Sequence, residues 1–259
     1  MMTRYPDIRV TDQDLLRRRD ESLSLGERPW NIVYGCQPAA EVCKTCFAHE
    51  RLLRFHGNAG RPFDPAARHR PVQVEEALAE PSGWSTPQQV VVAPMADLFQ
   101  PGVSANFVTR VMQVIAAHPQ HFFHLTTRYP ARMRELLLRT RLPDNLSLGV
   151  AAEDAASYAE RVPYLFDVPA LWRHVVLEPL LGPVDVERIE LPTRDILWPL
   201  EGLVQQYLGL DDHGRPQWLP KSDPLRRDQP LDWLLLGGER GNRPRPPHPD
   251  WVRRVREAC

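Results

Sequence analysis

Residues 122–151 read FFHLTTRYPARMRELLLRTRLPDNLSLGVA, and they set the architecture of the chain. The segment begins with a short apolar, β-branched run at Phe122–Thr127 and ends with another at Leu146–Ala151. Between the two runs, Ala131–Arg139 has the pattern of a helix. A strand, a helix and a second strand in succession predict two parallel strands joined by a right-handed crossover. This unit places the chain in the α/β class.

The same alternation extends outward in both directions from this unit. Four further apolar runs predict strands, and two further patterns predict helices. The strands are Asn31–Tyr34, Val90–Met95, His174–Leu177 and Leu231–Leu236, and the helices are Phe107–His118 and Ala155–Leu165. Six strands of this kind fit either an open doubly wound sheet or a curved, barrel-like sheet.

Polar side chains at the carboxyl ends of the predicted strands, or just after them, favour the barrel. These residues are Asp97, Thr126, Arg128, Glu153, Glu178 and Glu239. In barrel enzymes the carboxyl ends of the strands converge on one active site. We therefore predict an α/β fold with a partial (β/α)6 TIM-type barrel of parallel strands, and a candidate site at these strand ends.

The segment 183–230 interrupts the alternation of strands and helices. It is rich in charges and contains a turn-rich passage at Gly209–Pro216, with a short helix expected at Trp198–Leu208. We predict one domain over residues 1–259 with an insertion at about 183–230. A last helical pattern begins near Asp250.

Composition narrows the function classes. The chain has 259 residues, 42% hydrophobic and 25% charged, which is typical of a globular protein and excludes collagen and disordered classes. Lys plus Arg number 32 against 33 for Asp plus Glu, so no overall positive field attracts DNA or an anionic membrane. The sequence has no apolar run of about 18 residues, and the first residues are polar. We expect a cytoplasmic protein with no membrane partner.

Three cysteines indicate the chemistry. Cys36, Cys43 and Cys46 form a C-x6-C-x2-C pattern directly after the first predicted strand, before a helical pattern at Ala48–Phe55. Thiolates are soft ligands that suit iron–sulfur clusters and zinc. Three thiolates can hold a 4Fe-4S cluster and leave one iron open to another ligand. A structural zinc would need a fourth ligand, for which His49, His56 and His69 are the candidates.

Several motifs occur in a specific order over most of the chain. They are Trp30-Asn31, Gly35-Cys36, Val42-Cys43, Cys46-Phe47-Ala48, Met95–Phe99, Leu125–Arg128, Leu148–Val150, Glu153-Asp154, Leu177–Asp185 and Gly237-Gly238-Glu239. Together they resemble the phage and bacterial three-cysteine-motif family named after phage gene products thirty-seven and sixty-eight. This resemblance implies a relative of the radical S-adenosylmethionine enzymes. Such a relative would carry a 4Fe-4S cluster on Cys36, Cys43 and Cys46, bind S-adenosylmethionine and accept electrons from a reductant protein.

The polar residues at the strand ends fit such a ligand. An α-amino group and a ribose need carboxylate acceptors, which Asp97, Glu153, Glu178 and Glu239 could supply. A ligand carboxylate needs a cation, for which Arg128, beside Thr126, and Arg240 are candidates; Glu153, Glu178 and Arg128 are the preferred contacts. The expected function is an iron–sulfur enzyme that cleaves S-adenosylmethionine and abstracts hydrogen from an unknown substrate, with nucleic acid as one possible class. The alternative is a zinc-stabilised module that binds nucleic acid or protein without catalysis.

Overall fold

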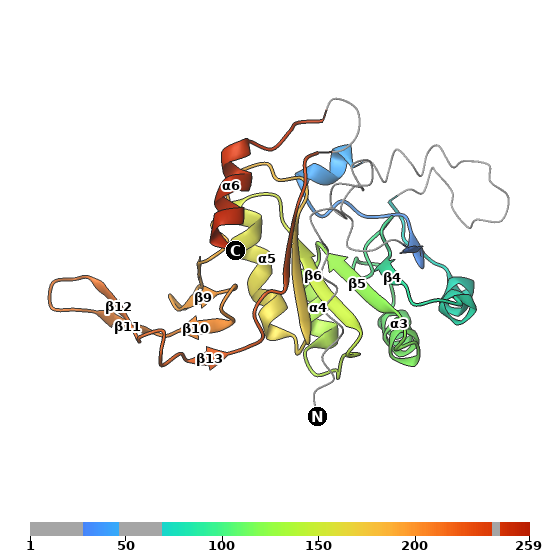
Figure 1. Ribbon diagram of the computed structural model, residues 1–259, viewed down its shortest axis with the longest axis horizontal. Helices are drawn as coiled ribbons and strands as arrows, with labels where there is room; N and C mark the ends of the chain where they lie inside the picture. Colours follow the sequence, from blue (N-terminus) through green and yellow to red (C-terminus); the bar gives the residue numbers. More distant parts are fainter. Residues whose placement is uncertain (1–27, 47–68, 240–243) are drawn as a thin grey trace.

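The computed structural model describes residues 28–46, 69–239 and 244–259 and shows a mixed α/β protein (Figure 1). Its centre is a six-stranded sheet in the order β1-β4-β5-β6-β7-β14. Every neighbouring pair of strands in this sheet is parallel. The strands are β1 (Arg28–Trp30), β4 (Gln89–Val92), β5 (Phe122–Thr127), β6 (Leu146–Ala151), β7 (Trp172–Leu177) and β14 (Trp233–Leu236).

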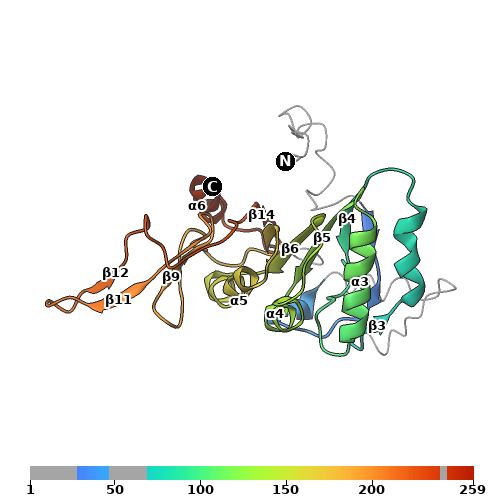
Figure 2. The same cartoon turned by 90° about the horizontal axis from the view of Figure 1, so that it is seen from below.

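Three helices cover one face of this sheet (Figure 2). They are α3 (Ala105–Ala117), α4 (Pro130–Leu137) and α5 (Ala155–Asp167), and α6 (Pro249–Ala258) lies near the end of the chain. Helix α3 buries the apolar side chains that recur along one of its faces, including Val108, Met112 and Ile115. Across the described ranges, the structure contains no helix with the length and apolar character needed to cross a membrane.

The sequence predicted the central elements well. Strands β5 and β6 have the expected bounds, and α3, α4 and α5 agree with the predicted helices to within two residues at each end. Residues Asp154 and Ser157 form a reciprocal capping box at the start of α5, which explains why that helix begins where it does. Strand β4 ends at Val92, earlier than expected, because Ala93 turns the chain with a φ of 51°.

The position of the first strand was predicted wrongly. The strand that joins the main sheet is β1, and the predicted run Asn31–Tyr34 lies just after it. Within that run, Val33–Tyr34 forms β2, which pairs antiparallel with β3 (Val72–Gln73) in a separate small sheet. Strand β1 lies at the edge of the main sheet, where a proline such as Pro29 is tolerated, so its sequence lacked the expected apolar pattern.

Residues 183–230 form short antiparallel strands where a short helix was expected at Trp198–Leu208. One sheet has the order β13-β10-β9-β8, and a hairpin of β11 and β12 extends away from the main sheet (Figure 1). The strands are β8 (Ile189–Glu190), β9 (Ile196–Trp198), β10 (Leu203–Gln205), β11 (Tyr207–Leu210), β12 (Pro216–Trp218) and β13 (Arg226–Arg227). Gly202 reverses the chain between β9 and β10 with a φ of 63°, and this reversal replaces the predicted helix.

Candidate functional site

A cavity of about 340 Å³ lies at the carboxyl ends of the parallel strands. Its lining includes all three clustered cysteines and five of the six polar residues that the sequence singled out at the strand ends. These lining residues are Cys36, Cys43, Cys46, Asp97, Thr126, Arg128, Glu178 and Glu239. The structure therefore brings together, in one hollow, side chains that lie as far as two hundred positions apart in the chain.

The three thiols come from a short stretch after β2. Cys36 is half-buried, Cys43 is buried in the 3-10 helix η1 (Glu41–Thr45), and Cys46 is half-buried at its end. The backbone N–H of Cys46 donates to the carbonyl of Cys43 at 3.3 Å, so a tight turn presents both sulfurs on the same wall. Burial is the main cause that raises the pKa of the Cys36 thiol, followed by the nearby carboxylate of Asp97 and the other two sulfurs. A cationic metal would reverse this effect by stabilising the thiolates.

Two residues that the sequence analysis missed fix the cysteine loop to the sheet. Gln100 is fully buried, donates from Nε2 to the carbonyl of Gly35 at 2.9 Å and accepts the backbone N–H of Gln37 at 2.8 Å. The hydroxyl of Tyr129 donates to the carbonyl of Gln37 at 2.7 Å. Both side chains follow strands of the main sheet, so they hold the loop over the strand ends. A polar Gln100 directly after the apolar pair Leu98-Phe99 is the sequence signal that could have identified it.

Asp97 is a buried carboxylate that organises the end of β5. Its oxygens accept the hydroxyl of Thr127 at 2.7 Å, the backbone N–H of Arg128 at 2.7 Å and that of Phe99 at 2.9 Å. Burial raises the pKa of Asp97, and these three hydrogen bonds oppose the rise. Most of its acceptor capacity is occupied by the protein itself, so Asp97 positions Arg128 in the cavity wall.

Arg128 belongs to a partly buried ionic cluster. Its Nη1 donates to Glu153 Oε2 at 2.8 Å, and its Nη2 donates to the carbonyl of Glu178 at 3.1 Å. The same carboxylate of Glu153 receives both Nη atoms of Arg161, at 2.8 and 3.1 Å. Two guanidinium groups therefore share the carboxylate of Glu153, and of the two only Arg128 lines the cavity.

Glu153 was predicted to contact a ligand directly, but it is not among the residues that line the cavity. It lies behind Arg128 and is 7% exposed. Both of its oxygens are occupied by the two arginines. The structure thus gives Glu153 a supporting position, whereas Arg128 faces the hollow.

Glu178 and Glu239 complete the acidic side of the cavity. Gly237 leaves room for Glu178, because a Cβ at Gly237 would come within 2.8 Å of the Glu178 side chain. Glu239 accepts Arg245 Nε at 2.9 Å and Nη2 at 2.8 Å, so an arginine holds its carboxylate in place. The lining of the cavity accordingly combines thiols, carboxylates and the guanidinium of Arg128.

Two buried histidines lie on the sheet face that leads to the cavity. His174 is fully buried, and His124 is 5% exposed. Burial lowers the pKa of His124 to about 4 and that of His174 to about 3, so both rings are neutral near neutral pH. Within the part of the chain that the structure describes, His124 Nδ1 has no hydrogen-bond partner.

We expect the free energy of unfolding to decrease as the pH falls below about 6.5. An unfolded histidine takes up a proton near its ordinary pKa of 6.5, whereas folded His124 does so only near 4, so acid favours the unfolded chain. Replacing His124 by phenylalanine should make this dependence shallower. Urea unfolding at about pH 7 and about pH 5 measures the difference. His213→Phe, at an exposed turn, is the control, and an equal change in slope for both variants would contradict the prediction.

No three His, Cys, Asp or Glu side chains lie close enough to hold one metal ion, as far as residues 28–46, 69–239 and 244–259 are concerned. A preformed zinc site that combines the three thiols with His69 is therefore absent there. The other proposed zinc ligands, His49 and His56, lie outside the described residues, as do the predicted helix 48–55 and Arg240. A single ion needs its ligands at about 2.0–2.3 Å, whereas a 4Fe-4S cluster places each thiolate on a different iron and so accepts more widely spaced sulfurs.

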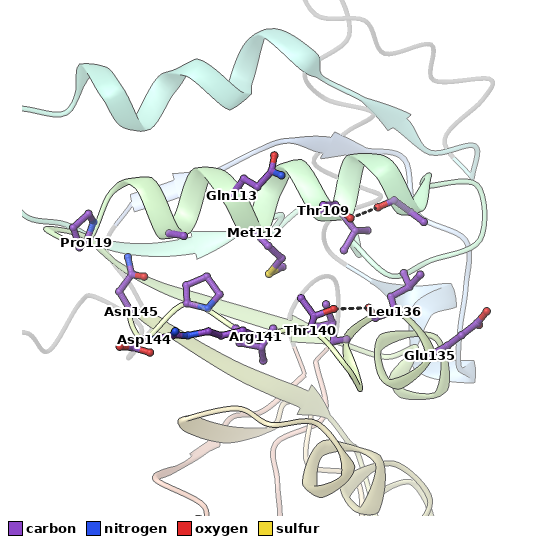
Figure 3. Close-up of a pocket in the computed structure, with 16 residues that line it drawn as sticks. Thr109, Met112, Gln113, Pro119, Glu135, Leu136, Thr140, Arg141, Asp144 and Asn145 are labelled. Atoms are coloured by element: carbon purple, nitrogen blue, oxygen red, sulfur yellow. Dashed lines mark hydrogen bonds between the residues drawn. The ribbon is translucent and has the colours of Figure 1, made fainter.

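A second hollow, of about 850 Å³, lies between α3 and α4 (Figure 3). Figure 3 shows Met112 from α3 pointing toward the side of the hollow where Leu136 and the segment that follows α4 lie. Its lining residues include no cysteine and no histidine. Although this hollow is larger, the reactive side chains are gathered at the strand ends, and we take the smaller cavity as the candidate site.

Comparison with known proteins identifies a family. A family model described as "Protein of unknown function (DUF5131)" matches residues 21–259, which is most of the chain. The chain belongs to this family. The family assignment covers both the cysteine loop and the six-stranded sheet of the DUF5131 chain, but its description names no activity. No curated protein and no solved structure matches.

This result corrects the resemblance drawn from the sequence. Neither the three-cysteine-motif family nor a radical S-adenosylmethionine family matches the chain; DUF5131 does. The described residues also contain no ready-made metal site. Short polar motifs at the ends of parallel strands occur on many unrelated α/β proteins, so their order in the sequence was not sufficient to identify a family.

Proposed function

We propose that the strand-end cavity holds a 4Fe-4S cluster on Cys36, Cys43 and Cys46, and that the protein is an enzyme that uses S-adenosylmethionine. Three free thiols on the wall of one cavity carry this proposal. They are accompanied by an arginine and by carboxylates, the groups that an amino acid with a ribose requires. The chemistry of this donor set supports the proposal, which does not depend on family membership.

We also propose that the main sheet is a partial barrel. Its strands follow one another in chain order, from β1 at one edge to β14 at the other. Helices α3, α4 and α5 all lie on the same face (Figure 2). A doubly wound sheet places helices on both faces, whereas winding in one direction with helices on the outside is the arrangement of a barrel. The opposite face would then enclose the cavity and limit the access of water.

The residues of the cavity would have separate roles toward the cluster and S-adenosylmethionine. The three cysteines bind the cluster, and the guanidinium of Arg128 binds and orients the carboxylate of S-adenosylmethionine. Glu178 accepts hydrogen bonds from the α-amino group or the ribose. When bound, the cluster supplies one electron for the reductive cleavage of S-adenosylmethionine, which leads to hydrogen abstraction from the substrate. A reductant protein provides that electron, and nucleic acid is one candidate class of substrate.

A reducing compartment suits this assignment. All four cysteines are unpaired, as expected where thiols stay reduced, and we propose a cytoplasmic location. A zinc-stabilised binding module remains the competing function. It would need a tetrahedral set of four ligands, and the absence of a three-ligand group from the described ranges argues against a preformed site of this kind.

Reconstitution tests the cluster. Protein purified without oxygen and incubated with iron and sulfide should turn brown and contain about four irons per chain. Cys43→Ala should lose most of this iron, because Cys43 is a buried thiol of the cavity wall. The visible spectrum and the iron content are the measurements.

Cys259→Ala is the matched control, because Cys259 is exposed and does not line the cavity. It should retain the iron content of the wild type. A colourless protein with one zinc per chain would refute the cluster and support the binding module. A brown protein that forms no 5′-deoxyadenosine with dithionite and S-adenosylmethionine would refute the enzymatic part of the proposal.

A further inference from the structure

A row of polar side chains crosses the buried face of the sheet and ends in the thiol cavity. Thr126, Gly149 and His174 lie side by side on β5, β6 and β7, because Gly149 pairs in register with each of the other two. The imidazole of His174 extends over Gly149, so that its Nε2 lies 2.7 Å from the hydroxyl of Thr126, two strands away. A Cβ at Gly149 would come within 2.2 Å of that nitrogen, so only glycine leaves room for this contact.

The other nitrogen of the same ring is also engaged. His174 Nδ1 lies 2.7 Å from the hydroxyl of Ser147, which is fully buried. Ser147, His174 and Thr126 thus form one hydrogen-bonded chain, and only Thr126 lines the cavity. Three polar groups in a sheet interior cost free energy to desolvate, so each hydrogen must have a partner.

The direction of the hydrogen bonds follows from this requirement. A neutral imidazole has one N–H donor and one acceptor nitrogen. In the described residues, the hydroxyl of Ser147 has His174 Nδ1 as its hydrogen-bond partner and no other side chain or carbonyl. Ser147 must therefore donate to Nδ1, since its proton would otherwise be buried without an acceptor. Consequently the proton of His174 is on Nε2, which donates to Thr126 Oγ1.

We infer that Ser147 and His174 are positioning residues that make the hydroxyl of Thr126 a hydrogen-bond donor to an oxygen of the bound ligand. Thr126 Oγ1 already accepts from His174, so its own proton is free to point into the cavity. Arg128 lies two residues further along the chain and lines the same cavity. The hydroxyl of Thr126 and the guanidinium of Arg128 can therefore both donate to the two oxygens of one anionic group. The preferred ligand group is a carboxylate. This inference rests on the proposed function for the identity of the ligand, but not for the direction of the chain of hydrogen bonds.

Nitrogen NMR of histidine tests the direction without any ligand. Protein labelled with ¹⁵N-histidine is measured as purified, and the His174 signals are assigned by their loss in His174→Gln. Nε2 should be protonated and Nδ1 unprotonated at neutral pH. In Ser147→Ala, which removes the donor to Nδ1, Nε2 should stay protonated because it still donates to Thr126, and the ¹⁵N signal of Nδ1 should shift because its hydrogen bond is lost. A His174 ring protonated at Nδ1 in the wild type would overturn the inference.

Binding of S-adenosylmethionine to the anaerobically reconstituted protein tests the role of Thr126. Thr126→Val should weaken binding about tenfold, because one hydrogen bond to a charged group is lost. Thr126→Ser, which keeps the hydroxyl, should bind within about threefold of the wild type. Thr140→Val, at an exposed site outside this cavity, is the matched control and should have no effect.

The outcomes separate the two proposals. If Thr126→Val binds as tightly as the wild type, Thr126 does not contact the ligand and the inference is overturned. If the wild type does not bind S-adenosylmethionine at all, the proposed function fails, and with it the assignment of the ligand. The NMR result then still decides whether Thr126 is a donor into the cavity.

Discussion

Replacing Glu153 by glutamine is expected to lower the free energy of unfolding by about 3 kcal/mol. Glu153 is 7% exposed, and its two oxygens accept three hydrogen bonds from Arg128 and Arg161. Glutamine has a similar shape but no charge, so the two guanidinium groups would remain close together without the carboxylate that both of them bind. Removal of one partner from a buried ion pair is costly because the remaining charge stays desolvated. Urea denaturation at neutral pH measures the change.

An exposed ion pair of the same type provides the comparison. Glu190 lies 3.7 Å from Arg188, and both side chains are exposed. Glu190→Gln should change the free energy of unfolding by less than about 0.5 kcal/mol, because solvent screens such pairs. Equal losses of unfolding free energy for Glu153→Gln and Glu190→Gln would show that burial does not strengthen the ion pairs of Glu153.

A double variant tests whether the loss comes from unpaired charge. Arg161 also donates to the carbonyl of Ala151 at 2.7 Å, so Arg161→Leu alone should be destabilising. In the Glu153→Gln background, however, Arg161→Leu removes an uncompensated charge. The loss in the double variant should therefore be smaller than the sum of the two single losses by at least about 1 kcal/mol. Additive losses would contradict the charge explanation.

The fold was predictable where the spacing of apolar residues along the chain matches the side chains that are buried. Strands β5 and β6 and helix α3 combine strong apolar patterns with clear ends, and their bounds were close to those observed. Strand β1 was misplaced because edge strands need few apolar residues, and the more apolar run at Ile32–Tyr34 is buried outside the main sheet. The chain reversal at Gly202 depends on a local backbone angle that hydrophobic patterns do not encode.

The candidate site was predictable in its location but not in its internal contacts. Polar residues after parallel strands must gather at one edge of the sheet, which correctly brought Asp97, Arg128 and Glu178 into one cavity. Which carboxylate faces a ligand and which supports an arginine depends on side-chain partners from other elements. Arg161, on α5, occupies Glu153, and no spacing rule links the two to Arg128. The family of the chain could not be determined from short motifs, because polar motifs at strand ends occur on many unrelated α/β proteins.

Replacing Trp30 by alanine should lower the free energy of unfolding by about 3–5 kcal/mol. Trp30 is fully buried at the edge strand β1, and its Nε1 donates to the carbonyl of Ala77 at 2.7 Å. The ring packs against Trp84 and Phe123, with centroids 6.4 and 5.6 Å away. Alanine would leave a large cavity between the sheet and the adjacent 3-10 helix η3 (Glu75–Gly83). Urea unfolding of the purified variant measures the loss.

Trp233 provides the matched control, because it lies on β14 at the opposite edge of the same sheet and is 38% exposed. Trp233→Ala should cost about 1–2 kcal/mol, since less of its surface is removed from water. Trp30→Phe keeps part of the aromatic surface but loses the hydrogen bond from Nε1 to the Ala77 carbonyl, so its loss of stability should lie between those of the two alanine variants. The backbone carbonyl of Trp30 also accepts from Ala93, whose segment lines the thiol cavity. Because this contact links β1 to the site, Trp30→Ala should reduce iron uptake as well as stability. Unchanged iron content in a destabilised variant would show that the cysteine loop is held independently of β1.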